Sequence, residues 1–275
     1  MLERYFQMKL EDFGLPVENL NLSWNVGFCQ GDFVSFTCSI DFDTMEKLLR
    51  KKLGIDIGPE SETNSLGSDD FNSMMHVLRD FGSNDLAIVE TNQTMYVESS
   101  DDFESVFDYA FQDIIAVYND TIPWDVNRRW NQEWNSFLQW LQSEARSLCS
   151  KLLRDAHEIL QAGITQDELV WSTSTDNFIV QLYETPAVDL NFDNYEEETR
   201  RDVYKSLVDG ELRYHGLIAK VLDRQSQRLL GESCHLDFLT PSGPCNRSYD
   251  GRRSELVGEA IHEARALFER HSIHA

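Results

Sequence analysis

The feature that most constrains the fold is a long run of aromatic and aliphatic residues at helical spacing in the middle of the chain. Residues 126–162 place large apolar side chains every three or four positions, which predicts one long helix. Four of the six tryptophans of the 275-residue chain lie between residues 124 and 140. Because aromatic side chains bury the largest apolar areas, we expect this helix to organise the core. Its stripe consists of Trp130, Trp134, Phe137, Leu138, Leu141, Leu148, Leu152 and Ile159.

The residues before this helix alternate between strand and helix patterns. Apolar residues alternate with polar ones in residues 20–28 and 33–42, and again within residues 85–98, which predicts two β-hairpins. In the helix that follows the first hairpin, Asp43 and Glu46 have the spacing of a capping box. The expected helices of this half, each with an apolar stripe, are residues 2–13, 43–53, 69–81 and 101–119.

The C-terminal part reads mainly as helical. The sequence therefore predicts an α+β fold, with a small antiparallel sheet from the hairpins packed on helices and a mostly helical C-terminal part. A change in charge places a boundary between an acidic α+β domain, residues 1–193, and a helical extension, residues 194–275. Residues 234–251 are expected to form a loop. The expected C-terminal helices are residues 175–184, 195–208, 211–230 and 253–270.

The charge itself is distributed unevenly. Residues 1–193 hold 34 acidic and 12 basic residues, whereas residues 194–275 hold 14 and 12, and the net charge is -24. Within residues 54–125, sixteen Asp or Glu residues accompany a single basic residue, Arg79. Such a segment repels nucleic acid and anionic membranes, and it attracts proteins that present basic grooves. Plain solubility is the alternative explanation of an acidic surface.

The first hairpin carries the stretch SWNVGFCQGDFVSF, from Ser23 to Phe36. Gly31 supplies the positive φ that a tight hairpin turn needs, and Asp32 suits a position beside it, so the structural interpretation is a hairpin tip. The functional interpretation is a contact point for a partner, because a hairpin tip is exposed. The residues predicted to bind a partner are Gln30, Asp32, Asp69, Asp70, Glu98, Asp101, Asp102, Glu104 and Asp108.

Motifs of catalysis and metal binding are sparse. The chain has no P-loop and no G-x-G-x-x-G, G-x-S-x-G or H-E-x-x-H motif. The carboxylates of Asp32, Asp41 and Asp43 could hold a divalent ion, but a helix cap explains Asp43 without one. Two further groups match no zinc spacing, so we expect no enzyme, no metal and no cofactor. These groups are His262 with His271 and His274, and Cys234 with His235 and Cys245.

Several features predict a protein of the cytosol. The five cysteines include no C-x-x-C pair, which is typical of a reduced chain. No stretch approaches the roughly 20 apolar residues that span a bilayer. The first residues, MLERYFQMKLEDFG, lack the apolar region of a signal peptide.

The stretch from Ser23 to Phe36 resembles the aromatic-x-x-G-F-x-x-Q-G-D-x-x-x-F signature of an uncharacterised group of tailed-phage and plasmid proteins, often labelled antitoxin-like. The likeness extends loosely over residues 10–193. It departs at Phe33, where the group has Gly, and at Tyr96-Val97-Glu98, where the group has Tyr-x-His. The resemblance implies a viral accessory gene expressed in the cytoplasm of a host bacterium, and it implies no activity. The matching residues are Trp24, Gly27, Phe28, Gln30, Gly31, Asp32 and Phe36.

Three functions remain open from the sequence. The first is a phage-encoded acidic protein that inhibits a host defence or nucleic-acid-handling complex, of the anti-restriction or anti-CRISPR kind, by mimicking nucleic acid. Its partner would be a basic protein or nucleoprotein complex, with no direct binding to nucleic acid or membrane. The second is a binder of nucleotides or small molecules, or a hydrolase, with Gln30, Gly31 and Asp32 lining a pocket. The third is a homo-oligomer with Trp130 and its helix at the seam.

Overall fold

The computed structural model of the chain contains two four-stranded antiparallel sheets and, among the residues that it describes, six α-helices. Contacts divide the chain into two compact units, an N-terminal unit, Glu3–Arg154, and a C-terminal unit, Asp155–Ala275 together with Met1–Leu2. The charge-based boundary at residue 193 stays a prediction. The residues described are 1–27, 31–55, 68–81, 86–91, 94–99, 124–187, 192, 194–242 and 249–272.

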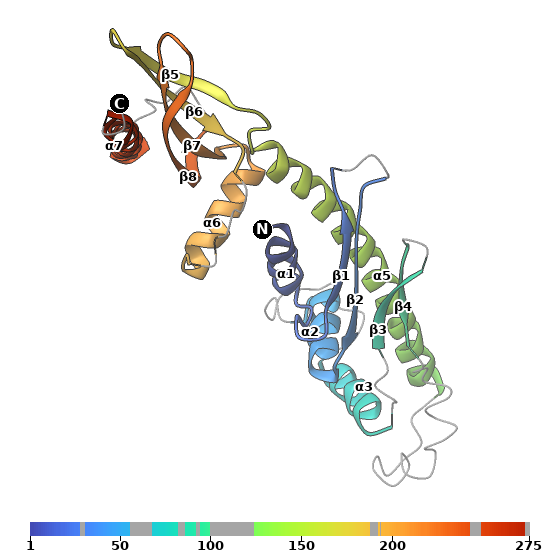
Figure 1. Cartoon of the computed structure of the whole chain (residues 1–275). Coiled ribbons are helices and arrows are strands. Elements are labelled where there is room, and N and C mark those ends of the chain that lie inside the picture. The colour runs from blue at the N-terminus through green and yellow to red at the C-terminus, as the bar shows by residue number, and fades with distance from the viewer. Residues whose placement is uncertain are drawn as a thin grey trace. The chain divides into compact units, whose positions relative to one another are not determined.

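The N-terminal unit is built on a sheet of strand order β1-β2-β3-β4 (Figure 1). Both predicted hairpins are confirmed, since β1 pairs with β2 and β3 with β4, each antiparallel. The helix expected over residues 101–119 lies outside the described residues. The strands are β1 (Asn21–Asn25), β2 (Phe33–Ile40), β3 (Leu86–Thr91) and β4 (Thr94–Glu98), and the helices are α1 (Leu2–Phe13), α2 (Phe42–Leu53), α3 (Ser68–Phe81) and α5 (Trp124–Gln161).

The first strand of this hairpin is shorter than the sequence suggests. Its last strand pair is Asn25 with Phe33, and since residues 28–30 lie outside the described residues, the tight turn stays a prediction. Gly31 does have the expected positive φ of 76°, but Gly27 also adopts one, of 83°. A left-handed residue cannot continue a strand, which is why β1 ends three residues before Phe28.

The two faces of this sheet differ in character. On one face, β2 presents buried apolar side chains, among them Val34 and Phe36. Trp24, the strand neighbour of Val34, meets Phe6 of α1 edge to face, at 6.1 Å between ring centroids. On the other face, the buried Ser35 donates its hydroxyl to the carboxylate of Glu90, at 2.6 Å. The first face is therefore ordinary core, and the second contains buried polar groups.

Helix α5 confirms the prediction of one long helix. Trp130 and Trp134 are 2% and 0% exposed, and Phe137 and Leu141 are fully buried. Trp140, on the same helix, stacks on Phe13 of α1 with ring centroids 6.1 Å apart. The buried tryptophans are thus core residues of a single chain, and they leave no tryptophan seam at Trp130 for a second copy.

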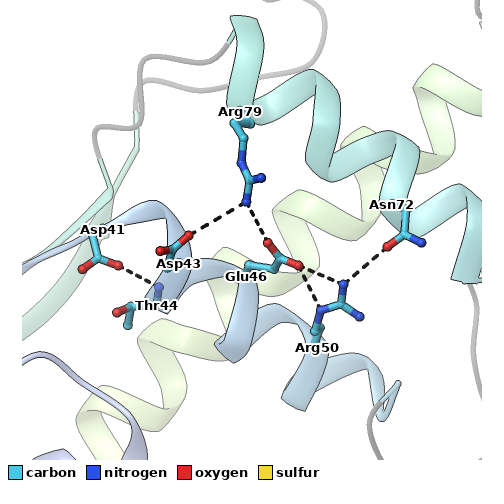
Figure 2. A network of polar contacts seen from close by, with 7 residues as sticks. All are labelled: Asp41, Asp43, Thr44, Glu46, Arg50, Asn72 and Arg79. Atoms are coloured by element: carbon cyan, nitrogen blue, oxygen red, sulfur yellow. Dashed lines mark hydrogen bonds and ion pairs between the residues drawn. The ribbon is translucent and has the colours of Figure 1, made fainter.

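Helices α2 and α3 are joined by a polar network (Figure 2). Glu46 of α2 accepts from Arg50 at 2.8 Å and from Arg79 of α3 at 3.2 Å. Arg50 also donates to Asn72 of α3 at 3.4 Å, and Arg79 lies 3.9 Å from Asp43. Because these contacts pair the start of α2 with the end of α3, the two helices run antiparallel.

The cap of α2 differs from the predicted one. Asp41, not Asp43, is the N-cap residue, and its carboxylate accepts from the backbone N–H of Thr44 at 2.7 Å. The capping box built on Asp43 and Glu46 is therefore wrong. Strand β2 ends at Ile40 and the helix begins at Phe42, so the residue between them takes the extended backbone that an N-cap requires.

The C-terminal unit is not mostly helical, and this prediction is corrected. Its centre is an antiparallel sheet of strand order β5-β6-β7-β8. The expected helices at residues 175–184 and 211–230 are wrong, because these segments form strands, and β8 also replaces the first eight residues of the predicted loop, 234–241. The strands are β5 (Glu168–Ser174), β6 (Phe178–Thr185), β7 (Leu212–Asp223) and β8 (Leu229–Pro241). The helices are α6 (Glu197–Val208) and α7 (Arg252–Ser272), preceded by the 3₁₀ turn η1 (Tyr249–Gly251).

One face of this second sheet packs against α7. Its buried residues alternate along β6 and β7, and they meet the apolar side of α7. The backbone of β8 approaches the helix most closely at Gly231, where an added Cβ would lie 2.2 Å from the carbonyl oxygen of Ala260. The core of this unit consists of Val180, Leu182, Leu217, Ala219, Val221, Tyr249, Leu256, Ala260 and Ala264. Among the described residues of both units, no helix is long and apolar enough to cross a membrane.

A candidate ligand cavity beside α5

The acidic residues predicted to bind a partner are only partly described. Asp32 precedes β2, Asp69 and Asp70 lie in the first turn of α3, and Glu98 ends β4. The other predicted residues, Gln30, Asp101, Asp102, Glu104 and Asp108, lie outside the described residues.

The sheet does not bring Asp32 and Glu98 together. Strand pairing aligns Glu98 with Ala87 and Ala87 with Ser39, near the end of β2. Asp32 lies seven positions before Ser39, at the other end of the strand. At about 3.3 Å per residue, the two carboxylates are separated by roughly 23 Å along the sheet.

Some of the described carboxylates of residues 54–125 are already bound within the chain. Asp70 pairs with Arg129 at 2.6 Å, and Asp80 lies 3.2 Å from His76. By contrast, the side chains of Asp69 and Glu98 make no hydrogen bond or ion pair within the described parts of the chain. Asp69 and Glu98 are therefore the described members that remain open to a partner.

Asp32 has a local structural role. Its carboxylate accepts a hydrogen bond from the backbone N–H of Gly27 at 3.1 Å, between the end of β1 and the start of β2. Asn25 donates its side-chain amide to the carbonyl of Gly31 at 3.2 Å. These two bonds brace the connection from both sides, which supports the structural interpretation of Asp32.

Asp32 also lies at the edge of a cavity of about 370 Å³. The cavity is formed by the start of β2, the start of β4 and the third quarter of α5. Cavities of 300–1,000 Å³ that combine apolar walls with a few polar groups are typical of small-ligand sites. It is lined by Asp32, Phe33, Val34, Thr94, Met95, Arg146, Cys149, Ser150 and Leu153.

The polar groups of the cavity are held in place from α5. Arg146 donates its Nε to the carbonyl oxygen of Met95 at 3.1 Å, which fixes the guanidinium beside β4. Ser150 donates its hydroxyl to the carbonyl of Arg146, one turn earlier, at 3.0 Å. The lining of the cavity thus includes the carboxylate of Asp32, the guanidinium of Arg146 and the hydroxyls of Thr94 and Ser150.

The thiol in this cavity is not a nucleophile at neutral pH. Burial, and secondarily the negative charge of Glu90, raise the pKa of the Cys149 thiol to about 12. Only the thiolate attacks or binds metal, so a pKa this high leaves Cys149 protonated and inert. Across the described part of the chain, no group of three His, Cys, Asp or Glu side chains could hold a metal ion.

A second polar cluster, which sequence reasoning missed, lies in the C-terminal unit. Glu184 of β6 is 1% exposed and accepts from the hydroxyl of Tyr249 at 2.7 Å and from Arg213. His215 is 0% exposed, lies 4.0 Å from Glu184 and contacts the hydroxyl of Thr240 at 3.2 Å. The hydrogen bond between Tyr249 and Glu184 thus joins η1 to β6 of the sheet.

The cavity could not have been found from the sequence as a unit. The stretch Gln30-Gly31-Asp32 indicates Asp32, but Arg146 and Cys149 lie on a helix that the sequence predicts only by its apolar stripe. Arg146 and Cys149 could be assigned to a site only if it were known that their side of the helix faces the sheet. Which side faces the sheet depends on the strand order, which the sequence does not show.

No family model, no curated protein and no solved structure matches this chain. The likeness of Ser23–Phe36 to the phage and plasmid group therefore stays a prediction, and the site must be judged on its own geometry.

Proposed function

We propose that the chain is a phage-encoded acidic interaction protein that binds and inhibits a host defence or nucleic-acid-handling complex. The observation that carries the proposal is where the charge of the N-terminal unit lies. Glu3–Arg154 contains 26 acidic and 12 basic residues, and residues 54–125 account for sixteen and one of them. Without that segment, the unit has ten acidic and eleven basic residues.

The basic residues outside this segment are largely engaged inside the unit. Lys52 pairs with Glu133 at 3.1 Å, Arg50 with Glu46 at 2.8 Å, and Arg129 with Asp70. They therefore neutralise particular carboxylates of the helices and leave the rest of the segment negative. A partner with a groove of Lys and Arg side chains would complement this charge. While the protein occupies the groove, the partner could not bind nucleic acid there.

The test is capture from bacterial lysate at 50 mM and 500 mM NaCl, followed by affinity measurement with the purified partner. We expect a basic nucleic-acid-binding partner whose affinity falls by at least about tenfold at the higher salt, because exposed charges are screened there. Nucleic acid that binds the partner should compete with the protein for it.

A matched pair of variants locates the binding charge. The first neutralises Asp69, Glu98, Asp101 and Asp102, and the control neutralises the exposed Glu168, Asp176, Glu196 and Glu198 of the C-terminal unit. Both lose four negative charges, but only the first should weaken binding. Equal weakening by both, or binding that ignores salt, would show that mimicry by residues 54–125 is wrong.

The cavity at Asp32 favours a second candidate, a protein that binds a nucleotide or another polar small molecule. Asp32 and Arg146 supply opposite charges on two sides of the cavity, which suits a ligand with both hydrogen-bond donors and an anionic group. Of the three residues predicted to line a pocket, Asp32 lines this cavity, Gly31 does not, and Gln30 lies outside the described residues.

Thermal unfolding in the presence of nucleosides, nucleotides and divalent ions tests this candidate. A ligand should raise the melting temperature of the wild type, and Ser150→Phe, which fills the cavity, should remove the effect. Ser143→Phe is the control, since Ser143 is exposed on the same helix. The candidate is abandoned if no compound shifts the wild type, or if both variants respond alike.

A further inference from the structure

A second cavity, of about 350 Å³, lies within the C-terminal unit between the β6–β7 face of the sheet and α7. None of its lining residues belongs to residues 54–125 or to the cavity at Asp32. The lining residues are Thr175, Phe178, Val180, Val221, Ile261, Ala264 and Arg265.

The floor of this cavity is apolar and firmly built. Val180 and Val221 are directly paired across β6 and β7, and they are 6% and 3% exposed. Ala264 of α7, 4% exposed, closes the opposite wall. These three residues belong to the core of the unit, so the floor of the cavity is part of the hydrophobic core.

The mouth of the cavity carries an unused positive charge. Arg265 is exposed, and it makes no hydrogen bond or ion pair with the residues that the structure describes. A second guanidinium lies close to the rim, because Arg224 donates to the backbone carbonyl of Thr175 at 2.9 Å. That bond also fixes the turn between β5 and β6 from which Thr175 and Phe178 enter the cavity.

The carboxylate at the end of β7 does not compete for Arg265. Asp223 accepts from the backbone N–H and the hydroxyl of Ser226, at 2.6 and 2.7 Å, in the turn that follows β7. These bonds lower the pKa of Asp223, so it stays ionised but is already satisfied within its own turn. Among the residues that the structure describes, no carboxylate therefore pairs with Arg265.

We propose that this cavity binds an amphiphilic monocarboxylate, whose hydrocarbon body fills the apolar floor and whose carboxylate pairs with Arg265. Guanidinium and carboxylate groups match each other in charge and in the geometry of two parallel hydrogen bonds. A protein with a net charge of -24 disfavours small anions in general, so binding of an anion at one place needs a local cation such as Arg265.

The size of the cavity selects a short chain. At about 30 Å³ for each non-hydrogen atom, the share that one water molecule takes in the liquid, 350 Å³ accommodates roughly ten such atoms. Octanoate has about that many, which makes it a suitable probe, and 1-octanol is its uncharged counterpart. Branched or aromatic acids of the same size belong to the same ligand class.

The experiment is isothermal titration of the full chain with octanoate and with 1-octanol, both below the concentrations at which they form aggregates. We expect octanoate to bind about tenfold more tightly than 1-octanol, as one favourable ion pair at a partly enclosed site allows. Arg265→Glu should abolish this preference, and Arg265→Lys should retain most of it. Ile261→Trp, which fills the cavity, should remove binding of both compounds.

Lys205→Glu is the matched control, because it makes the same change of charge on an exposed position of α6 in the same unit. It should leave octanoate binding unchanged. The proposal is overturned if octanoate does not bind, if 1-octanol binds as tightly, or if Arg265→Glu and Lys205→Glu have equal effects. Arg265 is exposed, so its variants are expected to fold, and circular dichroism confirms that they do.

Discussion

Asp41 determines where α2 begins. Its carboxylate accepts from the N–H of Thr44 at 2.7 Å, and this bond is the first cause of its lowered pKa. Asp41→Ala should reduce the free energy of unfolding by about 1 kcal/mol, because the helix then loses its side-chain cap. Urea denaturation at pH 7 measures this loss. Asp41→Asn is the control, since asparagine caps a helix as well as aspartate does.

The same residue gives a dependence on pH. The pKa of Asp41 in the folded chain is lowered from 3.8, so ionised Asp41 stabilises the fold above the pKa of the unfolded chain. This stabilisation is lost as the pH falls through the folded value. The difference between wild type and Asp41→Asn should therefore change in favour of the asparagine variant between pH 5 and roughly pH 2. A constant difference over that range would contradict the capping role.

Tyr249 gives a second prediction at the scale of a residue. Its hydroxyl donates to the buried carboxylate of Glu184 at 2.7 Å, and Tyr249→Phe leaves that carboxylate with one donor fewer. We expect a loss of about 1.5–3 kcal/mol in the free energy of unfolding, as for hydrogen bonds to charged groups. Tyr195→Phe is the matched control, because Tyr195 is 42% exposed. Chemical denaturation measures the free energy of unfolding of both variants. Equal values would contradict the hydrogen bond between Tyr249 and Glu184.

At the scale of elements, the backbones of β8 and α7 approach each other so closely at Gly231 that a side chain there has no room. A Cβ at Gly231 would lie 2.2 Å from the Ala260 carbonyl oxygen and 2.7 Å from the Ala264 nitrogen, and both are backbone atoms. Gly231→Ala therefore forces the strand and the helix apart, and it should destabilise the fold by about 1–3 kcal/mol. Thermal unfolding followed by circular dichroism measures the effect.

Gly258 provides the opposite case on the same helix. An added Cβ there meets nothing within 4 Å, and alanine is the better helix former. Gly258→Ala should thus stabilise the chain by roughly 0.5–1 kcal/mol. If Gly231→Ala were as harmless as Gly258→Ala, the packing of β8 on α7 described above would be wrong.

The sequence predicts the elements of the N-terminal unit well and those of the C-terminal unit poorly, for a physical reason. An apolar stripe that continues over about ten turns predicts helix α5. Strand β6, in contrast, buries mainly one face, so its buried positions alternate, as at Val180 and Leu182, whereas β7 buries four consecutive residues, 214–217. Over a short segment that also has apolar residues on the other face, such as Ile179, alternation is easily taken for helical spacing.

The candidate site shows the same limit. The QGD stretch identified Asp32 and the positive φ of Gly31, since turn chemistry is local. It could not identify Arg146, which reaches Met95 from a helix fifty-one residues further along the chain. Contacts of that kind depend on which face of α5 meets the sheet. The residues that line the cavity together with Asp32 therefore become visible only in the fold.

For the whole molecule, the net charge is divided more evenly between the two structural units than between residues 1–193 and 194–275. The N-terminal unit carries a net charge of -14 and the C-terminal unit -10, from the 48 acidic and 24 basic residues of the chain. What distinguishes the N-terminal unit is that residues 54–125 alone carry -15. Self-repulsion at low ionic strength should therefore be concentrated in one segment there and spread out in the C-terminal unit.

This difference can be measured without knowledge of any partner. At low salt, the repulsion among the carboxylates of residues 54–125 destabilises the folded chain, and salt screens it, since the Debye length falls from about 30 Å at 0.01 M to about 10 Å at 0.1 M. We expect the melting temperature of the wild type to rise between 10 and 300 mM NaCl by on the order of 2–4 °C, which corresponds to about 1 kcal/mol. Neutralising Asp69, Glu98, Asp101 and Asp102 should reduce this rise more than neutralising Glu168, Asp176, Glu196 and Glu198. An equal reduction would mean that the charge of residues 54–125 does not act as one concentrated field, and the proposed docking of a basic partner would lose its basis.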